Sequence, residues 1–277
     1  MNVDSMISRK LPIGIQSFEY LRKEGYLYVD KTELVYRLVK LGKPYFLSRP
    51  RRFGKSLLLS TLEAYFLGKK ELFEGLAIGE LEQDWFTYPV LHLSLNAEKY
   101  DSKERLVNLL ESQLQSWEST YGVTEINRSY SIRFMTVIRR AYEQTGRRVV
   151  VLIDEYDKPM LRSFDNPELQ HEFRETLMAF YTVLKDADAY LQFVFITGVT
   201  KFAQMGIFSN LNQLQDISLH PAYTTLCGMT RAEIEAVFAP ELQSLACANG
   251  LTYEETMEKL TRRYDGYHFN YRNWEGM

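Results

Sequence analysis

The sequence predicts an α/β fold, in which helices cover a mostly parallel, five-stranded sheet. Two observations support this fold class. Short apolar runs alternate along the chain with longer helical patterns, an order that is typical of parallel sheets. One run, at 148–153, continues from Val149 to Ile153 without a polar residue, as expected of a strand that is buried on both faces.

The individual elements follow from the same patterns. We expect strands at 44–47, 89–95, 148–153 and 190–197, with a weaker one at 216–219. Helices are predicted at 16–24, 32–41, 56–67, 102–120, 130–145 and 167–186. Asp30 or Thr32 would cap the second helix, and Asn166 the last, which begins with Pro167. Glycines mark several helix ends: Gly25, Gly68, Gly122 and Gly146.

The sequence changes character after residue 227. Thr230 with Glu233, and Thr252 with Glu255, match the T-x-x-E pattern that starts helices. Further helices are expected near 240–249 and at 252–264. We therefore expect an α/β domain over 1–227, of which 1–42 form an N-terminal helical extension, and a small helical lid over 228–277.

The most specific motif lies between the strand at 44–47 and the helix at 56–67. The string SRPRRFGKS at 48–56 ends in the Gly-Lys-Ser order of a phosphate-binding loop. There, backbone N–H groups cradle phosphates, the lysine reaches the β- and γ-phosphates, and the serine hydroxyl binds Mg²⁺. The predicted nucleotide-binding residues are Arg49, Arg51, Arg52, Phe53, Gly54, Lys55, Ser56 and Leu57.

One position departs from the usual pattern, G-x-x-x-x-G-K-[ST], which has glycine where this chain has Arg49. Pro50 has no N–H group, so the loop offers fewer backbone donors than a glycine-rich one. Three interpretations of Arg49, Arg51 and Arg52 stay open. They pair with nucleotide phosphates, with nearby acidic residues, or with nucleic acid.

A second motif completes the pattern of a nucleotide-hydrolysing site. The apolar strand at 148–153 leads into Asp154 and Glu155, which would lie at the C-terminal edge of the sheet. Asp154 would hold Mg²⁺ and Glu155 would activate the attacking water. Acidic residues after a buried strand are common, and the phosphate-loop pattern upstream is what favours the functional interpretation.

The positions of the two motifs along the chain also predict the strand order. One candidate strand lies between the motifs and one follows the acidic pair, which fits ATPases in which a further strand separates the loop strand from the Asp-Glu strand. We expect the order 5-1-4-3-2, a P-loop NTPase arrangement. Thr197, at the end of the strand at 190–197, would then touch the γ-phosphate or the attacking water. The structural alternative is a threonine that only precedes a glycine turn.

Composition argues against several other classes of function. Of the 277 residues, 45% are hydrophobic and 25% charged, as in an ordinary folded protein. A net charge of −3 and an isoelectric point near 5.9 give no general attraction to nucleic acid or membranes. The N-terminus lacks a signal-peptide pattern, and no apolar stretch approaches the roughly 18 residues that span a bilayer. Two cysteines and four histidines show no metal-ligand spacing, so a reduced, cytoplasmic protein is expected.

Seven segments together resemble one known family. They are LPIGI at 11–15, YVDKT at 28–32, LSRPRRFGKS at 47–56, ELFEGL at 71–76, IDEYDKP at 153–159, TGVTKF at 197–202 and YDGYHF at 264–269. Over nearly its whole length the chain resembles the predicted AAA-ATPase-like family. In that family the arginine-rich loop is the norm, which implies that Arg49 is a family trait rather than decay of the site.

The resemblance implies an ATP-binding domain that is usually followed by a nuclease-like domain of the PD-(D/E)xK type. This chain stops at 274–277, about where such a domain would begin, so we expect the ATPase half alone and assign no nuclease residues.

We therefore expect a domain that binds ATP with Mg²⁺ and hydrolyses it slowly, beside a nuclease-like domain or partner protein. Lys55 would neutralise phosphate charge, Ser56 and Asp154 would hold Mg²⁺, and Glu155 would activate water. Two alternatives are a module that only senses nucleotide or serves as a scaffold, and a module that binds DNA through its arginines. The sequence makes no prediction of the oligomeric state.

Overall fold

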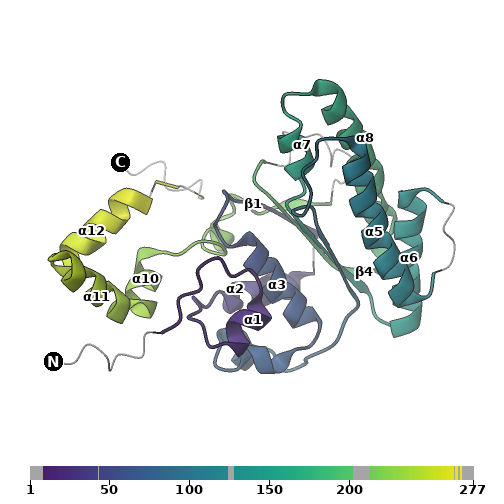
Figure 1. Ribbon diagram of the computed structural model, residues 1–277. Coiled ribbons are helices and arrows are strands. Elements are labelled where there is room, and N and C mark those ends of the chain that lie inside the picture. Colours follow the sequence, from purple (N-terminus) through teal and green to yellow (C-terminus); the bar gives the residue numbers. More distant parts are fainter. Residues whose placement is uncertain are drawn as a thin grey trace.

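A five-stranded parallel sheet forms the centre of the protein (Figure 1). The structure, a computed structural model, describes residues 9–42, 44–123, 128–201, 213–264, 266–267 and 269. The strand order is β2-β3-β4-β1-β5, and all four pairings are parallel. The predicted order, 5-1-4-3-2, is confirmed. The strands are β1 (Pro44–Ser48), β2 (Val90–Ser94), β3 (Val149–Asp154), β4 (Leu191–Gly198) and β5 (Gln215–Asp216).

Each face of the sheet carries its own apolar core. Strand β3 is buried along its whole length, and its side chains alternate between the two faces. Val149, Val151 and Ile153 belong to one core, and Val150 and Leu152 belong to the other. A strand covered on both sides has no solvent-facing positions, which explains the unbroken apolar run in its sequence.

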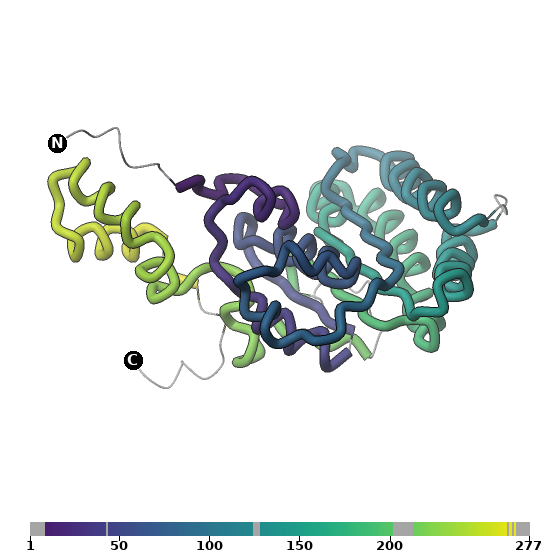
Figure 2. Tube along the Cα trace, turned by 90° about the horizontal axis from the view of Figure 1, so that it is seen from below, coloured from purple at the N-terminus to yellow at the C-terminus, as the bar shows by residue number. Residues whose placement is uncertain are grey.

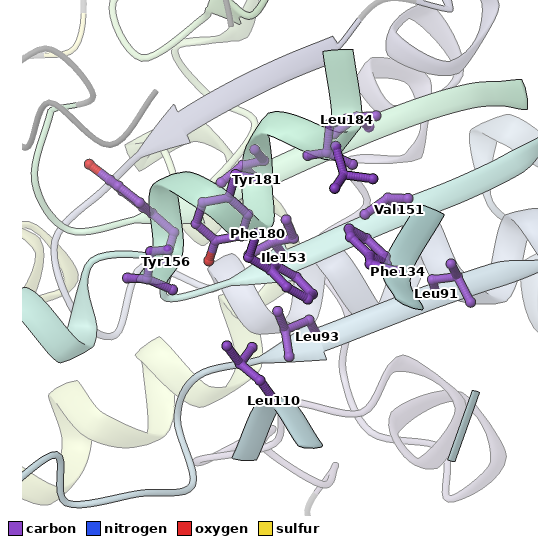
Figure 3. Close-up of a cluster of buried hydrophobic side chains, with 14 of the residues drawn as sticks. Leu91, Leu93, Leu110, Phe134, Val151, Ile153, Tyr156, Phe180, Tyr181 and Leu184 are labelled. Atoms are coloured by element: carbon purple, nitrogen blue, oxygen red, sulfur yellow. The ribbon is translucent and has the colours of Figure 1, made fainter. Parts of the chain in front are cut away.

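Three long helices cover the first face: α5 (Lys103–Tyr121), α6 (Tyr130–Thr145) and α8 (Pro167–Asp186). Figure 3 shows Phe134 of α6 and Phe180 of α8 with Val151 and Ile153 of β3. The two phenylalanine rings are stacked, with centroids 4.5 Å apart. The helices are amphipathic, so the same residue pattern that predicts them also fixes which side they bury.

The second face is covered by N-terminal elements. They are α1 (Phe18–Lys23), α2 (Thr32–Leu41), α3 (Lys55–Phe66), the 3₁₀ helix η2 (Lys70–Phe73) and α4 (Ala77–Leu81). Shorter connecting elements are α7 (Lys158–Arg162), η3 (Asp188–Tyr190) and η4 (Pro221–Tyr223). The N-cap residue of α2 is Lys31, whose side chain makes no capping hydrogen bond, so neither Asp30 nor Thr32 is the cap that the sequence predicts. Asp30 lies one residue before Lys31, and its Oδ1 accepts hydrogen bonds from the N–H and hydroxyl of Thr32, at 2.8 and 2.6 Å. Helices α1 and α2 correspond to those predicted at 16–24 and 32–41.

The last strand is shorter than the sequence predicts. It covers only Gln215–Asp216, and not 216–219, beside β1. Beyond it, Ser218 turns toward the end of β1, where its hydroxyl accepts a hydrogen bond of 2.8 Å from the Ser48 N–H. At the end of β1, where the phosphate-loop motif begins, a hydrogen bond to a side chain thus takes the place of backbone pairing with β5.

The remaining helices pack on one another at one end of the molecule (Figure 2). They are α10 (Arg231–Val237), α11 (Ala239–Asn249) and α12 (Tyr253–Tyr264), and both predicted capping boxes are present. Two ion pairs connect these helices to the N-terminal part of the chain: Lys31 with Glu233, and Arg9 with Glu241. Among the described residues, none of the helices has the length and apolarity needed to cross a membrane.

A buried ion pair between α5 and α6 gives a test of this packing. Arg133 is buried and donates hydrogen bonds to both carboxylate oxygens of Glu118, each at 2.7 Å. The substitution Arg133→Met leaves the buried Glu118 carboxylate without this partner. We expect the free energy of unfolding to fall by about 3–5 kcal/mol, measured by denaturant titration.

The matched control is Arg139→Met on the same helix, whose exposed pair with Glu143 spans 3.8 Å. That change should alter stability by less than about 1 kcal/mol. Equal effects of the two substitutions would contradict this account of the α5–α6 interface.

Candidate functional site

The loop after β1 turns sharply before helix α3 begins at Lys55. Gly54 precedes the helix with a φ of 86°, and a Cβ added to it would meet no atom within 4 Å. Glycine is therefore favoured there by backbone conformation and not by lack of space. The first N–H groups of a helix have no acceptor within it, so the start of α3 is suited to an anion.

The Asp154 carboxylate at the end of β3 is the centre of the site. It is only 3% exposed and accepts two hydrogen bonds, each of 2.6 Å. One comes from the Ser56 hydroxyl on α3, and the other from the Thr197 hydroxyl on β4. The structure thus brings together three residues that the sequence assigns to one site, although 98 positions separate Ser56 from Asp154.

The Lys55 ammonium lies inside the curve of the loop. It donates hydrogen bonds to the carbonyl oxygens of Arg49 and Pro50, at 3.0 and 3.1 Å. Burial lowers the pKa of Lys55, and the negative charges of Glu155 and Asp154 act in the opposite direction. The lysine is thus a cation held by carbonyl oxygens, which bear no formal charge, at the place where the motif expects phosphates.

Glu155 directly follows β3 in an unusual conformation. Its φ is 51°, a left-handed value that non-glycine residues seldom adopt. Such conformations cost free energy and are concentrated at functional sites. One carboxylate oxygen lies 3.7 Å from the ammonium of Lys158, the first residue of α7. The turn places Glu155 beside Asp154 at the C-terminal edge of the sheet, where ligands of parallel α/β folds bind.

Comparison with known proteins also indicates a nucleotide-binding, ATPase-like module. The sequence profile of a family described as predicted AAA-ATPase matches residues 12–208. The chain belongs to this family. A relative from Azotobacter chroococcum mcd 1, described as an uncharacterized protein in the vnfD 5′ region, is 41% identical over 273 residues. That alignment covers 98% of this chain and 50% of the relative, so the chain spans about half the relative's length.

Membership of the predicted AAA-ATPase family supports a nucleotide-binding, ATPase-like module. The matched residues include the whole phosphate loop, Asp154, Glu155 and Thr197. The C-terminal helices α10–α12 lie outside the matched residues.

In this predicted AAA-ATPase, the side chain of Arg49 is buried in the protein. It is 1% exposed, and its guanidinium donates to the carbonyl oxygens of Ser48 and Ser218, at 2.9 and 2.6 Å. Longer bonds of 3.3 and 3.4 Å reach the carbonyl oxygens of Tyr223 and Thr224. Arg49 as a nucleotide-binding residue stays a prediction. These contacts do not favour it, because the guanidinium is already bound to backbone carbonyl oxygens. The guanidinium instead joins the start of the loop to the chain that follows β5.

The other residues of the loop divide into two groups. Arg51 and Arg52 are exposed, with Arg52 in a left-handed conformation at a φ of 68°. Phe53 instead packs against aromatic rings near the end of the chain, with centroids 4.8 Å from Tyr267 and 5.6 Å from Phe269. Leu57 is partly buried on the second face of the sheet. The exposed cations of the loop are therefore Arg51 and Arg52.

Asp157 supports the candidate site, although neither sequence motif assigns it a role. It is fully buried, and its Oδ2 accepts hydrogen bonds from the N–H groups of Val199 and Thr200, at 3.0 and 2.6 Å. It therefore fixes the turn that follows Thr197. The sequence left open whether Asp157 lines the site or pairs with Lys158, and only its position in the IDEYDKP string indicated a role.

The described residues include no group of three or more histidines, cysteines or acidic residues placed to hold a metal ion. Magnesium bound with a nucleotide needs fewer protein ligands, because phosphate oxygens and water complete its shell. Ser56 Oγ and the Asp154 carboxylate offer the oxygen ligands that this ion prefers, and their contact places them close enough to share it. The chemistry of the residues present therefore fits Mg²⁺.

The buried Arg49 generates a test in which the usual glycine is restored. Arg49→Gly removes the guanidinium and leaves the carbonyl oxygens of Ser48 and Ser218 without its hydrogen bonds. We expect the free energy of unfolding to fall by about 2–4 kcal/mol, measured by denaturant titration.

Arg52→Gly is the matched control in the same loop. Glycine adopts a φ of 68° without steric strain, so stability should change by less than about 1 kcal/mol. Higher stability in Arg49→Gly than in the natural protein would refute the structural role of Arg49.

Proposed function

We propose that the protein binds ATP together with Mg²⁺ and hydrolyses it slowly. One observation carries this proposal: the Asp154 carboxylate lies between the hydroxyls of Ser56 and Thr197, each 2.6 Å away. Ser56 lies on α3, which starts at the loop, and Asp154 ends β3. Thr197 lies on β4, the strand between β1 and β3. In P-loop ATPases, a serine or threonine of the loop and an aspartate at a strand end together hold the Mg²⁺ of the nucleotide.

Each residue has a specific role in the proposed reaction. The N–H groups at the start of α3 would hold the phosphates, with Gly54 allowing the turn. Lys55 would exchange its carbonyl partners for phosphate oxygens. Ser56 and Asp154 would hold Mg²⁺, which neutralises charge on the phosphates. Glu155 would accept a proton from the attacking water, and Thr197 would orient that water or the γ-phosphate.

The exposed arginines extend the proposed phosphate site. Arg51 and Arg52 lie in the same loop as Lys55 and are exposed to solvent. Guanidinium groups bind phosphate oxygens through two parallel hydrogen bonds, so both arginines would strengthen the grip on a polyphosphate. Arg49 is omitted from this role, because backbone carbonyl oxygens surround its guanidinium.

We further propose that α10–α12 form a lid and that the ATPase module acts with a nuclease-like domain or partner. The two ion pairs of Lys31 and Arg9 support the lid, because they connect these helices to the segments beside the sheet. The 50% coverage of the Azotobacter chroococcum relative leaves length for another domain in that protein. The family resemblance suggests a nuclease-like one.

The proposal predicts different effects for two substitutions. Lys55→Ala removes the cation that would neutralise phosphate charge, so ATP binding should be lost in isothermal titration with Mg²⁺. Glu155→Gln keeps the size of the side chain and one accepting oxygen but removes the negative charge and the base. It should bind ATP normally and lose the phosphate release that the natural protein shows, a loss of roughly 100-fold or more.

Equal ATP affinity of the natural protein and Lys55→Ala would contradict the proposed binding site. Normal binding with no phosphate release above that of Glu155→Gln would favour the alternative of a non-hydrolysing sensor. A third outcome, a salt-dependent complex with DNA that ATP competes away and that Arg51→Ala weakens, would favour DNA binding through the exposed arginines.

A further inference from the structure

A lysine beside the proposed base makes contacts that the ATPase motifs do not explain. Lys158 Nζ donates hydrogen bonds to the backbone carbonyl of Asn96, at 2.5 Å, and to the side-chain carbonyl of the same residue. The same ammonium lies 3.7 Å from a carboxylate oxygen of Glu155. Asn96 follows β2, Glu155 follows β3 and Lys158 begins α7, so the three residues connect neighbouring strand ends.

The strand register explains why these residues meet. Ser94 lies beside Asp154 in the parallel ladder, and the N–H of Leu95 donates to the Asp154 carbonyl oxygen at 3.1 Å. Asn96 is therefore held next to the turn that contains Glu155. This position depends on the backbone hydrogen bonds of the buried sheet, so it is rigid compared with a position in a free loop.

The hydrogen-bonding capacity of the ammonium matches its surroundings. A lysine has three N–H donors, and Asn96 takes two of them. The Glu155 carboxylate, at 3.7 Å, is an ion-pair partner beyond hydrogen-bond distance, and the third donor can turn toward it. The Lys158 and Glu155 side chains are only 12% and 21% exposed, so their attraction is screened less than that of a surface pair.

We propose that Lys158 is a positioning residue: anchored on Asn96, it holds the Glu155 carboxylate in the orientation that hydrolysis requires. This inference rests on the proposed function, in which Glu155 accepts the proton of the attacking water. Glu155 itself adopts a strained, left-handed backbone conformation, and its flexible side chain needs an external contact to select one orientation. Lys158 supplies that contact, and the hydrogen bonds and ion pair of its side chain within the described residues are to Asn96 and Glu155.

The test uses Lys158→Met, which keeps an unbranched side chain of similar size but removes the charge. We expect the turnover number for phosphate release to fall roughly 10- to 100-fold. The ATP dissociation constant should stay within about twofold of the natural value, since the polar partners of the Lys158 side chain in the described part of the chain, Asn96 and Glu155, lie outside the phosphate loop. Lys158→Arg restores a cation and should recover most of the lost turnover.

A double substitution separates positioning from general support of the fold. In the Glu155→Gln background, Lys158→Met should cause no further loss of turnover, because Lys158 acts only through Glu155. Asn96→Ala is the second variant if Lys158→Met does not fold. It removes one of the two anchors and should lower turnover several-fold without changing ATP affinity. Lys103→Met is the matched control, since Lys103 lies 3.5 Å from Glu172 in an exposed pair away from the loop.

The inference about Lys158 is overturned if Lys158→Met turns over ATP like the natural protein, or if it weakens ATP binding as much as turnover. A further loss in the Glu155→Gln background would also overturn it. Failure of the proposed function has a different signature: the natural protein and Glu155→Gln then release phosphate at the same rate. In that case the positioning role of Lys158 falls with it.

Discussion

The hydrogen bonds that Ser56 and Thr197 donate to Asp154 hold the candidate site together. They join the start of α3, the end of β3 and the end of β4, three elements from distant parts of the chain. The site has this geometry only if β4 lies between β1 and β3, which is the observed strand order. The two apolar cores fix that order, because β3 and β4 are buried on both faces. The packing of the sheet and the chemistry of the site therefore depend on the same strand order.

The arginine at the glycine position of the phosphate loop has a consistent physical explanation. Arg49 directs both terminal nitrogens of its guanidinium, Nη1 and Nη2, to carbonyl oxygens at the end of β1 and after β5. The buried Arg49 side chain thus ties the start of the loop to the chain after β5, while Lys55, Arg51 and Arg52 supply the other positive charges of the loop. A glycine-rich loop relies on backbone freedom, and this loop relies on an internal anchor.

The sequence predicted features that depend on local or periodic patterns. Strand order, most helices and both capping boxes follow from residues close together in the chain or from the motif order. Features set by distant contacts were missed. The shortened β5 depends on Ser218 reaching Ser48, and the true partners of Arg49 lie up to 175 positions away. The contact of Lys158 with Asn96 spans 62 positions and has no sequence signature.

The Arg49 anchor also has a consequence for the order in which the protein forms. The acceptor nearest to its guanidinium, the Ser218 carbonyl, is 169 positions later in the chain, and in the described structure β1 lies between β4 and β5, which also come later. During synthesis the phosphate loop therefore emerges from the ribosome long before the chain that orders it. Long-range pairings of this kind form late in folding. An incomplete chain would thus carry the whole phosphate-loop motif in its sequence and still lack a structured nucleotide site.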